Sequence, residues 1–99
     1  MTIFYLMIEA VPKQDNPESK EFGGAFINLW VKATTKNEAL KKAKNYVDEV
    51  NWKFVNAEEI SVAKRSTYID KPDSLECYDE ACEKGLSAIF YTWAIGEDV

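Results

Sequence analysis

The sequence predicts an α+β fold: a two-layer sandwich in which a four-stranded, largely antiparallel sheet carries two helices on one face. Four segments of strand length alternate their side chains with a period of two, and two others repeat apolar residues at helical spacing. A chain of 99 residues suits one domain, which we expect to span 1–99. The order ββαβαβ is ferredoxin-like in element content. Two helices cover only one face of such a sheet, so the other face needs a cover.

The first two expected strands are apolar on both sides. In the segment 2–11 the sides are formed by Phe4, Leu6, Ile8 and Ala10 and by Tyr5, Met7, Glu9 and Val11. In the segment 25–34 they are formed by Ala25, Ile27, Leu29, Val31 and Ala33 and by Phe26, Asn28, Trp30 and Lys32. An antiparallel hairpin brings one side of each together on a face that carries Tyr5, Met7, Glu9, Phe26, Asn28 and Trp30. The polar segment 12–24 between them predicts a mobile loop.

A helix is expected to follow the second strand. Thr35 can accept a hydrogen bond from the backbone amide of Glu38, and the Glu38 side chain can reach back, which is the pattern of a capping box. Asn51 ends this helix. Its apolar stripe consists of Ala39, Leu40, Ala43, Tyr46, Val47 and Val50.

The second half of the chain predicts a strand, a helix and a strand. The third strand is expected around 58–65, and its polar character favours an edge position. The run 70–73 starts the second helix, because Asp caps well and Pro72 is tolerated in a first turn. This helix carries an apolar stripe of Leu75, Tyr78, Ala81 and Cys82. Gly85 caps its end, the last strand spans 86–95, and the tail 96–99 is expected to be flexible.

The chain lacks most residue types that carry out catalysis. It contains no His, no Cys-x-x-Cys pair, no Gly-rich phosphate loop and no serine elbow. We therefore expect no enzymatic activity, no cofactor and no metal site. Glu9 is the one catalytic candidate, with Tyr5 or Lys32 as its partner, because burial in an apolar strand would raise its pKa. The competing interpretation is a solvated or Lys-paired carboxylate near the strand end.

The net charge and the spacing of the cysteines limit the cellular location and the partners that we expect. Cys77 and Cys82 are too far apart along a helix for a disulfide, so both are expected to be reduced, with Cys82 in the core. The apolar run 2–11 is too short to span a bilayer. These features predict a cytoplasmic protein that does not bind membranes. A net charge of −5 disfavours a nucleic-acid partner.

Two surfaces are candidates for binding a protein, and the leading hypothesis is a non-enzymatic interaction module. The segment 70–83 holds six acidic residues and one lysine, a surface that can attract a basic partner. The alternative is a solvated face whose acids complement the Lys-rich first helix beside it. An exposed aromatic patch is the second surface. The expected interaction residues are Asp73, Glu76, Asp79, Glu80, Glu83, Phe26 and Trp30.

In size, acidity and lack of catalytic residues the chain is similar to small bacterial immunity or inhibitor proteins, which neutralise a basic toxin domain. This likeness is one of composition and covers no motif. The alternative hypothesis is a dimeric small-ligand or sensory domain with a pocket on the aromatic sheet face. Its expected ligand-binding residues are Tyr5, Met7, Glu9 and Trp93. Which face of the last strand is core remains open, and with it the position of Tyr91 and Trp93.

Overall fold

Four strands form one antiparallel sheet in the order β3-β1-β2-β4 in the computed structural model, which describes residues 1–96. The strands are β1 (Thr2–Pro12), β2 (Phe22–Ala33), β3 (Trp52–Val62) and β4 (Leu86–Ala94). The helices are α1 (Lys36–Glu49), α2 (Pro72–Lys84) and the short 3-10 helices η1 (Pro17–Lys20) and η2 (Arg65–Tyr68). The α+β class and the four-stranded antiparallel sheet are confirmed. The ferredoxin-like arrangement is not, because neither the strand order nor the full element order establishes it.

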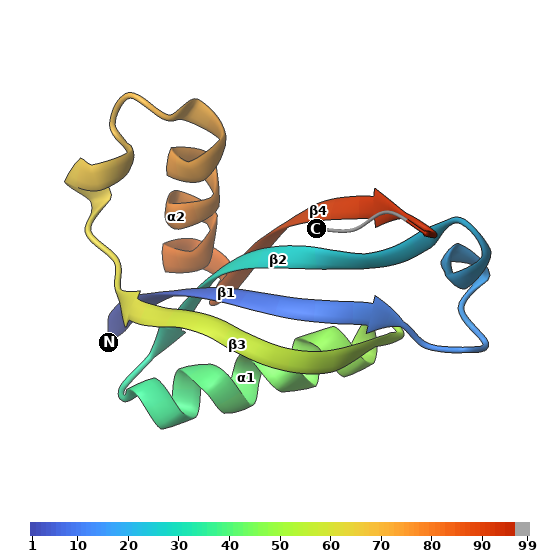
Figure 1. The fold of residues 1–99 in the computed structure, drawn as a ribbon. Coiled ribbons are helices and arrows are strands. Elements are labelled where there is room, and N and C mark those ends of the chain that lie inside the picture. The colour runs from blue at the N-terminus through green and yellow to red at the C-terminus, as the bar shows by residue number, and fades with distance from the viewer. Residues whose placement is uncertain (97–99) are drawn as a thin grey trace.

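The two helices lie on opposite sides of the sheet, so the prediction that both cover one face is wrong. Figure 1 shows α1 below the sheet and α2 above one end of it. We call the side that packs against α1 the inner face and the other side the outer face. The outer face is apolar at its covered end, where Ile3 and Trp30 pack with Ala81 of α2. A second helix there buries surface that α1 cannot reach, and this decides its position.

The main core lies between the inner face and α1. Alternate residues of the two central strands meet Ala39, Ala43 and Val47 of α1, whose small side chains let the helix lie close to the sheet. Phe90 of β4 joins this cluster and contacts the Trp52 ring edge-on, with ring centroids 5.4 Å apart. The even-numbered side of the last strand is therefore core. The strand residues of the cluster are Phe4, Leu6, Ile8, Ala10, Ala25, Ile27, Leu29, Val31 and Ala33.

The expected antiparallel hairpin is confirmed, and so is the expectation of which sides of its two strands share a face. Tyr5 pairs with Trp30, and Glu9 pairs with Phe26, so the side chains grouped by the alternation share the outer face. The connection between the two strands is shorter than the expected loop of 12–24, because β1 includes Pro12 and β2 already begins at Phe22. Its mobility stays a prediction. The tail lies mostly outside the described residues, which end at 96.

Two boundaries differ from those expected. β3 begins at Trp52 rather than near residue 58, because two irregularities in its pairing with β1 break the simple alternation of its side chains. Its edge position is confirmed. At the start of α2, Lys71 is the N-cap residue and makes no side-chain capping bond, so the acids of this turn do not cap the helix.

The apolar stripe of α2 is rotated relative to the expected one. Ala81 is buried and Cys77 and Tyr78 pack beside it, whereas Cys82 is exposed instead of lying in the core. Both cysteines are free thiols, as expected. Gly85 ends the helix in a left-handed conformation with φ 100°, and its amide donates to the carbonyl of Ala81.

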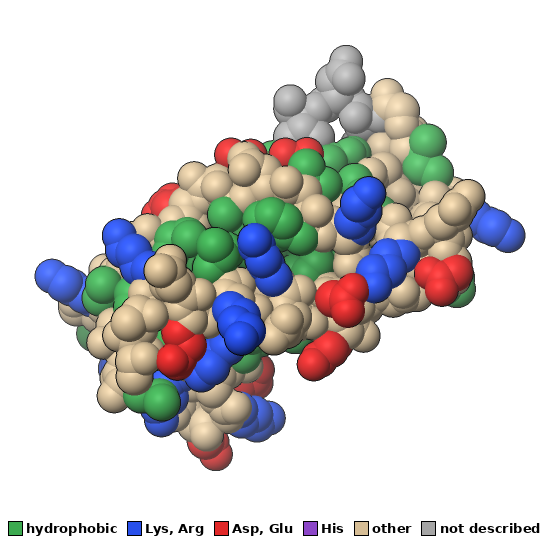
Figure 2. Space-filling model, turned by 90° about the horizontal axis from the view of Figure 1, so that it is seen from below, with side chains coloured by type: hydrophobic (Ala, Val, Ile, Leu, Met, Phe, Trp, Pro, Cys, Tyr) green, Lys and Arg blue, Asp and Glu red, His purple; other side chains and the backbone are tan. Residues whose placement is uncertain are grey.

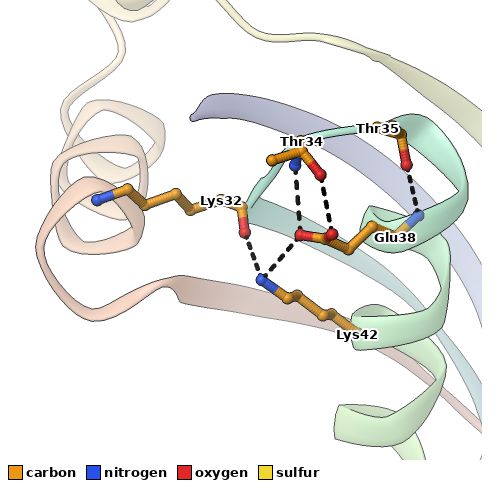
Figure 3. A network of polar contacts seen from close by, with 5 residues as sticks. All are labelled: Lys32, Thr34, Thr35, Glu38 and Lys42. Carbon is orange, nitrogen blue, oxygen red and sulfur yellow. Dashed lines mark hydrogen bonds and ion pairs between the residues drawn. The ribbon is translucent and has the colours of Figure 1, made fainter.

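The start of α1 is held by a network of polar contacts (Figure 3). The Thr35 hydroxyl accepts from the Glu38 amide at 3.1 Å, as the capping box predicts. The Glu38 carboxylate reaches one residue further back, where it accepts from the amide and hydroxyl of Thr34 at 3.3 and 2.9 Å. Lys42 pairs with Glu38 at 3.3 Å and donates to the carbonyl of Lys32 at 3.0 Å. The network ties the first two turns of the helix to the end of β2.

We expect Thr35→Ala to lower the free energy of unfolding by about 1 kcal/mol, because an orphan amide of the first turn loses its acceptor. The measurement is equilibrium unfolding in urea. Thr35→Ser keeps a hydroxyl and is the matched control. Equal losses in the two variants would show that the capping bond is not the cause.

The carboxylate of Glu38 should contribute a pH dependence to stability. The hydroxyl and amide of Thr34 and the ammonium of Lys42 hold the pKa of Glu38 below its usual value. A pKa lowered in the folded state gives stability that is present above the unfolded pKa and lost as pH falls through the folded one. The free energy of unfolding of Glu38→Gln should therefore change less with pH below about pH 5 than that of the wild type. Parallel pH profiles for the two proteins would contradict this.

Candidate functional site

The outer face of the sheet is only partly covered, and the candidate sites lie there. At one end α2 buries Trp30, which is 1% exposed, together with Ile3 and Ala63 of the neighbouring strands. α2 does not extend to the other end, where Tyr91 is 53% exposed. A face that is apolar, aromatic and half covered can bind another molecule.

The uncovered half carries an aromatic patch formed by Phe26, Tyr91 and Trp93. The rings of Phe26 and Trp93 contact each other with centroids 5.3 Å apart. Trp93 lies against Gly24, where an added Cβ would sit 2.4 Å from its ring carbon Cζ2. The indole therefore rests on the sheet only because this position has no side chain. Tyr91, two residues before Trp93 on β4, is exposed.

The acidic residues of α2 differ in how far they are neutralised. Asp79 accepts two hydrogen bonds from Arg65, at 2.9 and 3.1 Å, and this pairing lowers the pKa of its carboxyl. Glu80 pairs with Lys84 at 4.0 Å. Within residues 1–96 no ion pair is formed by the other three acids, which are Asp73, Glu76 and Glu83.

The Lys-rich helix does not neutralise these acids, contrary to one of the two expectations. α1 lies on the opposite side of the sheet and has no contact with α2. Figure 2 views the molecule from below, the side of α1 in Figure 1, and shows Lys and Arg side chains across this face around a strip of hydrophobic ones. Exposed lysines of α1 such as Lys41 are therefore separated from the acids of α2 by the sheet.

A groove, which we call the acidic groove, connects the acidic helix α2 to the sheet. It has a volume of about 370 Å³ and lies between α2 and β4. One wall carries carboxylates and the other is formed by the strand, with Ile89 next to the aromatic patch along β4. Its lining residues are Asp73, Glu76, Cys77, Glu80, Ser87, Ala88 and Ile89. Acidic and apolar surfaces thus meet on one side of the molecule.

The structure separates the residues predicted from the sequence into two groups. The predicted acids lie on α2, and Phe26 belongs to the aromatic patch, where it is half-buried. Trp30 does not lie on an exposed patch, because α2 and Tyr68 cover it. Of the expected ligand residues, Tyr5 lies at the covered end of the face, whereas Met7, Glu9 and Trp93 lie on its other part.

Glu9 is not placed to work with Lys32. Glu9 pairs with Phe26 at one end of the hairpin and Lys32 pairs with Ile3 at the other. Lys32 instead donates to the carbonyl of Cys82 at the end of α2, at 3.2 Å. The proposed acid–base pair of these two residues is therefore wrong.

A second hollow, which we call the Trp30 pocket, contains Tyr5 of the expected ligand-binding residues but not Met7, Glu9 or Trp93. It has a volume of about 370 Å³ and lies between the covered end of the sheet, η2 and the start of α2. Two buried polar atoms, Trp30 Nε1 and Asn28 Oδ1, belong to its lining residues and have no hydrogen-bond partner among residues 1–96. A buried polar atom without a partner costs about 1–3 kcal/mol. Asn28 was visible in the sequence as the one amide in an apolar strand, but its unpaired state depends on the tertiary packing.

Tyr5 is the titratable phenol of this pocket. Burial, and secondarily the charge of Glu59, raises the pKa of Tyr5 to about 12. Its hydroxyl is therefore protonated near neutral pH and can donate a hydrogen bond. In the described part of the chain, no three acidic or cysteine side chains converge to hold a metal ion.

No family model, curated protein or solved structure matches this chain. None of the described helices has both the length and the hydropathy to cross a membrane. The function proposed below therefore depends on the geometry of the outer face.

The contact between Gly24 and Trp93 yields a stability prediction. We expect Gly24→Ala to lower the free energy of unfolding by about 1–3 kcal/mol, because the new Cβ overlaps the indole and also lies 3.0 Å from the carbonyl oxygen of Ala10. In a Trp93→Ala background the same substitution should cost less. Urea unfolding of all four proteins measures the coupling, and additive losses would contradict the assigned contact.

Proposed function

We propose that the chain is a non-enzymatic protein-binding module that recognises a basic protein partner through its outer face. One observation carries the proposal: α2, with its unpaired acids, and the exposed aromatic patch lie on the same side of the sheet, and the groove that Asp73 and Glu76 line reaches Ile89, two residues before Tyr91 on β4. Each feature alone is compatible with an ordinary solvated surface. Their proximity provides both parts of a recognition surface, an apolar anchor and a charged border.

Charge supports a basic partner. Asp73, Glu76 and Glu83 keep their charges without a cation among residues 1–96, and the lysines of α1 lie across the sheet. Such a surface accelerates association with a positively charged protein and disfavours an acidic one. Tyr91 is a suitable anchor, because tyrosine buries a large area at a low cost in conformational entropy.

The finer proposal is a small acidic inhibitor of the immunity type, acting in the cytoplasm. The acidic surface supports it, since a basic toxin domain is a partner of the required charge. Two free thiols are compatible with a reducing compartment.

The test is retention of partners on the immobilised chain. The wild type, a Glu76→Lys/Glu83→Lys variant and a Glu18→Lys/Glu49→Lys control are each exposed to lysate at low and high salt. Both double variants change the net charge equally, but the control residues lie outside α2. We expect basic proteins to bind the wild type and the control in a salt-sensitive manner and to be lost from the α2 variant.

Purified partners then allow the affinity to be measured. Tyr91→Ala should weaken binding by about tenfold if Tyr91 is an anchor, without changing the salt dependence.

In the retention experiment, equal retention by the wild type and the α2 variant would show that the acidic helix is not the binding surface. Loss of binding in the Glu18/Glu49 control as well would point to net charge rather than to a site.

A further inference from the structure

The Trp30 pocket is a second site on the outer face, separate from the acidic groove. The groove lies between α2 and β4, whereas the pocket lies on the other side of α2, toward β3. Its volume of about 370 Å³ is at the lower end of the range for small-molecule sites. It is lined by Tyr5, Asn28, Trp30, Glu59, Ser61, Val62, Ala63, Lys64, Thr67, Tyr68, Lys71 and Ser74.

The floor of the pocket offers one donor and one acceptor that the protein does not use. Trp30 and Asn28 are two residues apart on β2 and point to the same face. Trp30 Nε1 is a donor and Asn28 Oδ1 an acceptor, and neither has a partner in the part of the chain that the structure describes. A ligand that carries both an acceptor and a donor, as an amide or lactam does, can pair with them.

The walls of the pocket select a flat molecule. The Tyr5 ring lies 5.4 Å from that of Trp30, and the Tyr68 ring meets Trp30 edge-on at 5.8 Å. The Tyr5 ring, and the Tyr68 ring once it has moved to admit a ligand, can pack against a further planar ring. The protonated hydroxyl of Tyr5 adds a donor at the wall.

The rim of the pocket favours an anion. Lys64 and Lys71 are exposed and form no ion pair within the described residues. Glu59 is the one carboxylate of the lining, and it accepts a hydrogen bond from Ser61 at 3.3 Å. Two cations against one anion leave the rim positive.

We propose that the Trp30 pocket binds a small planar heterocyclic anion, whose amide-like edge pairs with Trp30 and Asn28 and whose charged group lies between Lys64 and Lys71. This site does not depend on the function proposed above, because different side chains form it.

Access to the floor requires Tyr68 to move. Both unpaired atoms are covered, and the Tyr68 ring is one of the two rings that pack against Trp30. Tyr68 belongs to η2, a four-residue 3-10 helix without a side-chain cap, between β3 and α2. The ring is half-buried and packs with the small cluster around Trp30 rather than with the main core, so it can turn aside without disturbing that core. Binding should therefore change the environment of Tyr68 as well as that of Trp30.

The experiment uses three probes and the indole N–H signals of the intact chain in ¹H–¹⁵N NMR. Orotate has a planar ring, a lactam edge and a carboxylate; uracil lacks the carboxylate, and benzoate lacks the edge. The chain has three tryptophans, and of these only Trp30 lines the pocket. We expect orotate to shift the Trp30 signal with a Kd of about 1 mM or below, and uracil and benzoate to bind more weakly. Trp52 and Trp93 serve as internal references.

Variants of surface lysines distinguish an effect on the binding site from an effect on the fold. Lys64→Gln/Lys71→Gln should weaken orotate binding by about tenfold and leave uracil binding unchanged, because only the charged group is affected. Lys36→Gln/Lys41→Gln on α1 is the matched control. The proposal is overturned if orotate and other heterocyclic carboxylates, such as nicotinate, fail to shift Trp30 at about 10 mM. Equal weakening by the two lysine variants would overturn the assigned rim.

Discussion

The central β1–β2 pair must be covered on both of its faces, and the rest of the structure depends on this constraint. The inner side chains of the pair are buried against α1, including Leu6, Ile8, Ile27 and Leu29. Ile3 and Trp30 on the outer side need a separate cover, which α2 provides. Because one helix cannot bury both sides, the chain must place its second helix across the sheet from the first. A single helix of 13 residues does not extend over the whole outer face, so part of that face stays open.

This division of the helices also separates the charges. α1 carries four lysines and lies under the inner face, while the acids of α2 lie on the outer side. Had both helices packed on one face, their side chains would have been close enough to neutralise each other. Three carboxylates of α2 instead remain unpaired within residues 1–96, on the same side of the sheet as the uncovered aromatic residues. The packing of the core therefore creates the surface on which the proposed protein recognition depends.

The covered end of the outer face contrasts with the open end. Trp30 contacts Tyr5 and Tyr68 and is almost fully buried, yet its indole N–H has no partner within the described residues. At the open end Trp93 rests on Gly24 and Tyr91 is exposed. Two tryptophans on one face of the sheet thus have different environments, because α2 reaches only one of them. The first environment suits a small ligand and the second suits a protein surface.

Local patterns were enough to predict most elements and the faces that the hairpin strands share. Alternation places Tyr5 and Trp30 on one face, the capping pattern at Thr35 starts α1, and Gly85 ends α2, because each depends only on residues close in sequence or on a two-residue period. The acidic helix could also be predicted, since charge is a property of composition. Alternation cannot say which of two apolar faces a helix will choose. Only the tertiary structure placed α2 across the sheet, buried Trp30 and left its N–H unpaired, because these outcomes depend on which distant segments compete for the same surface.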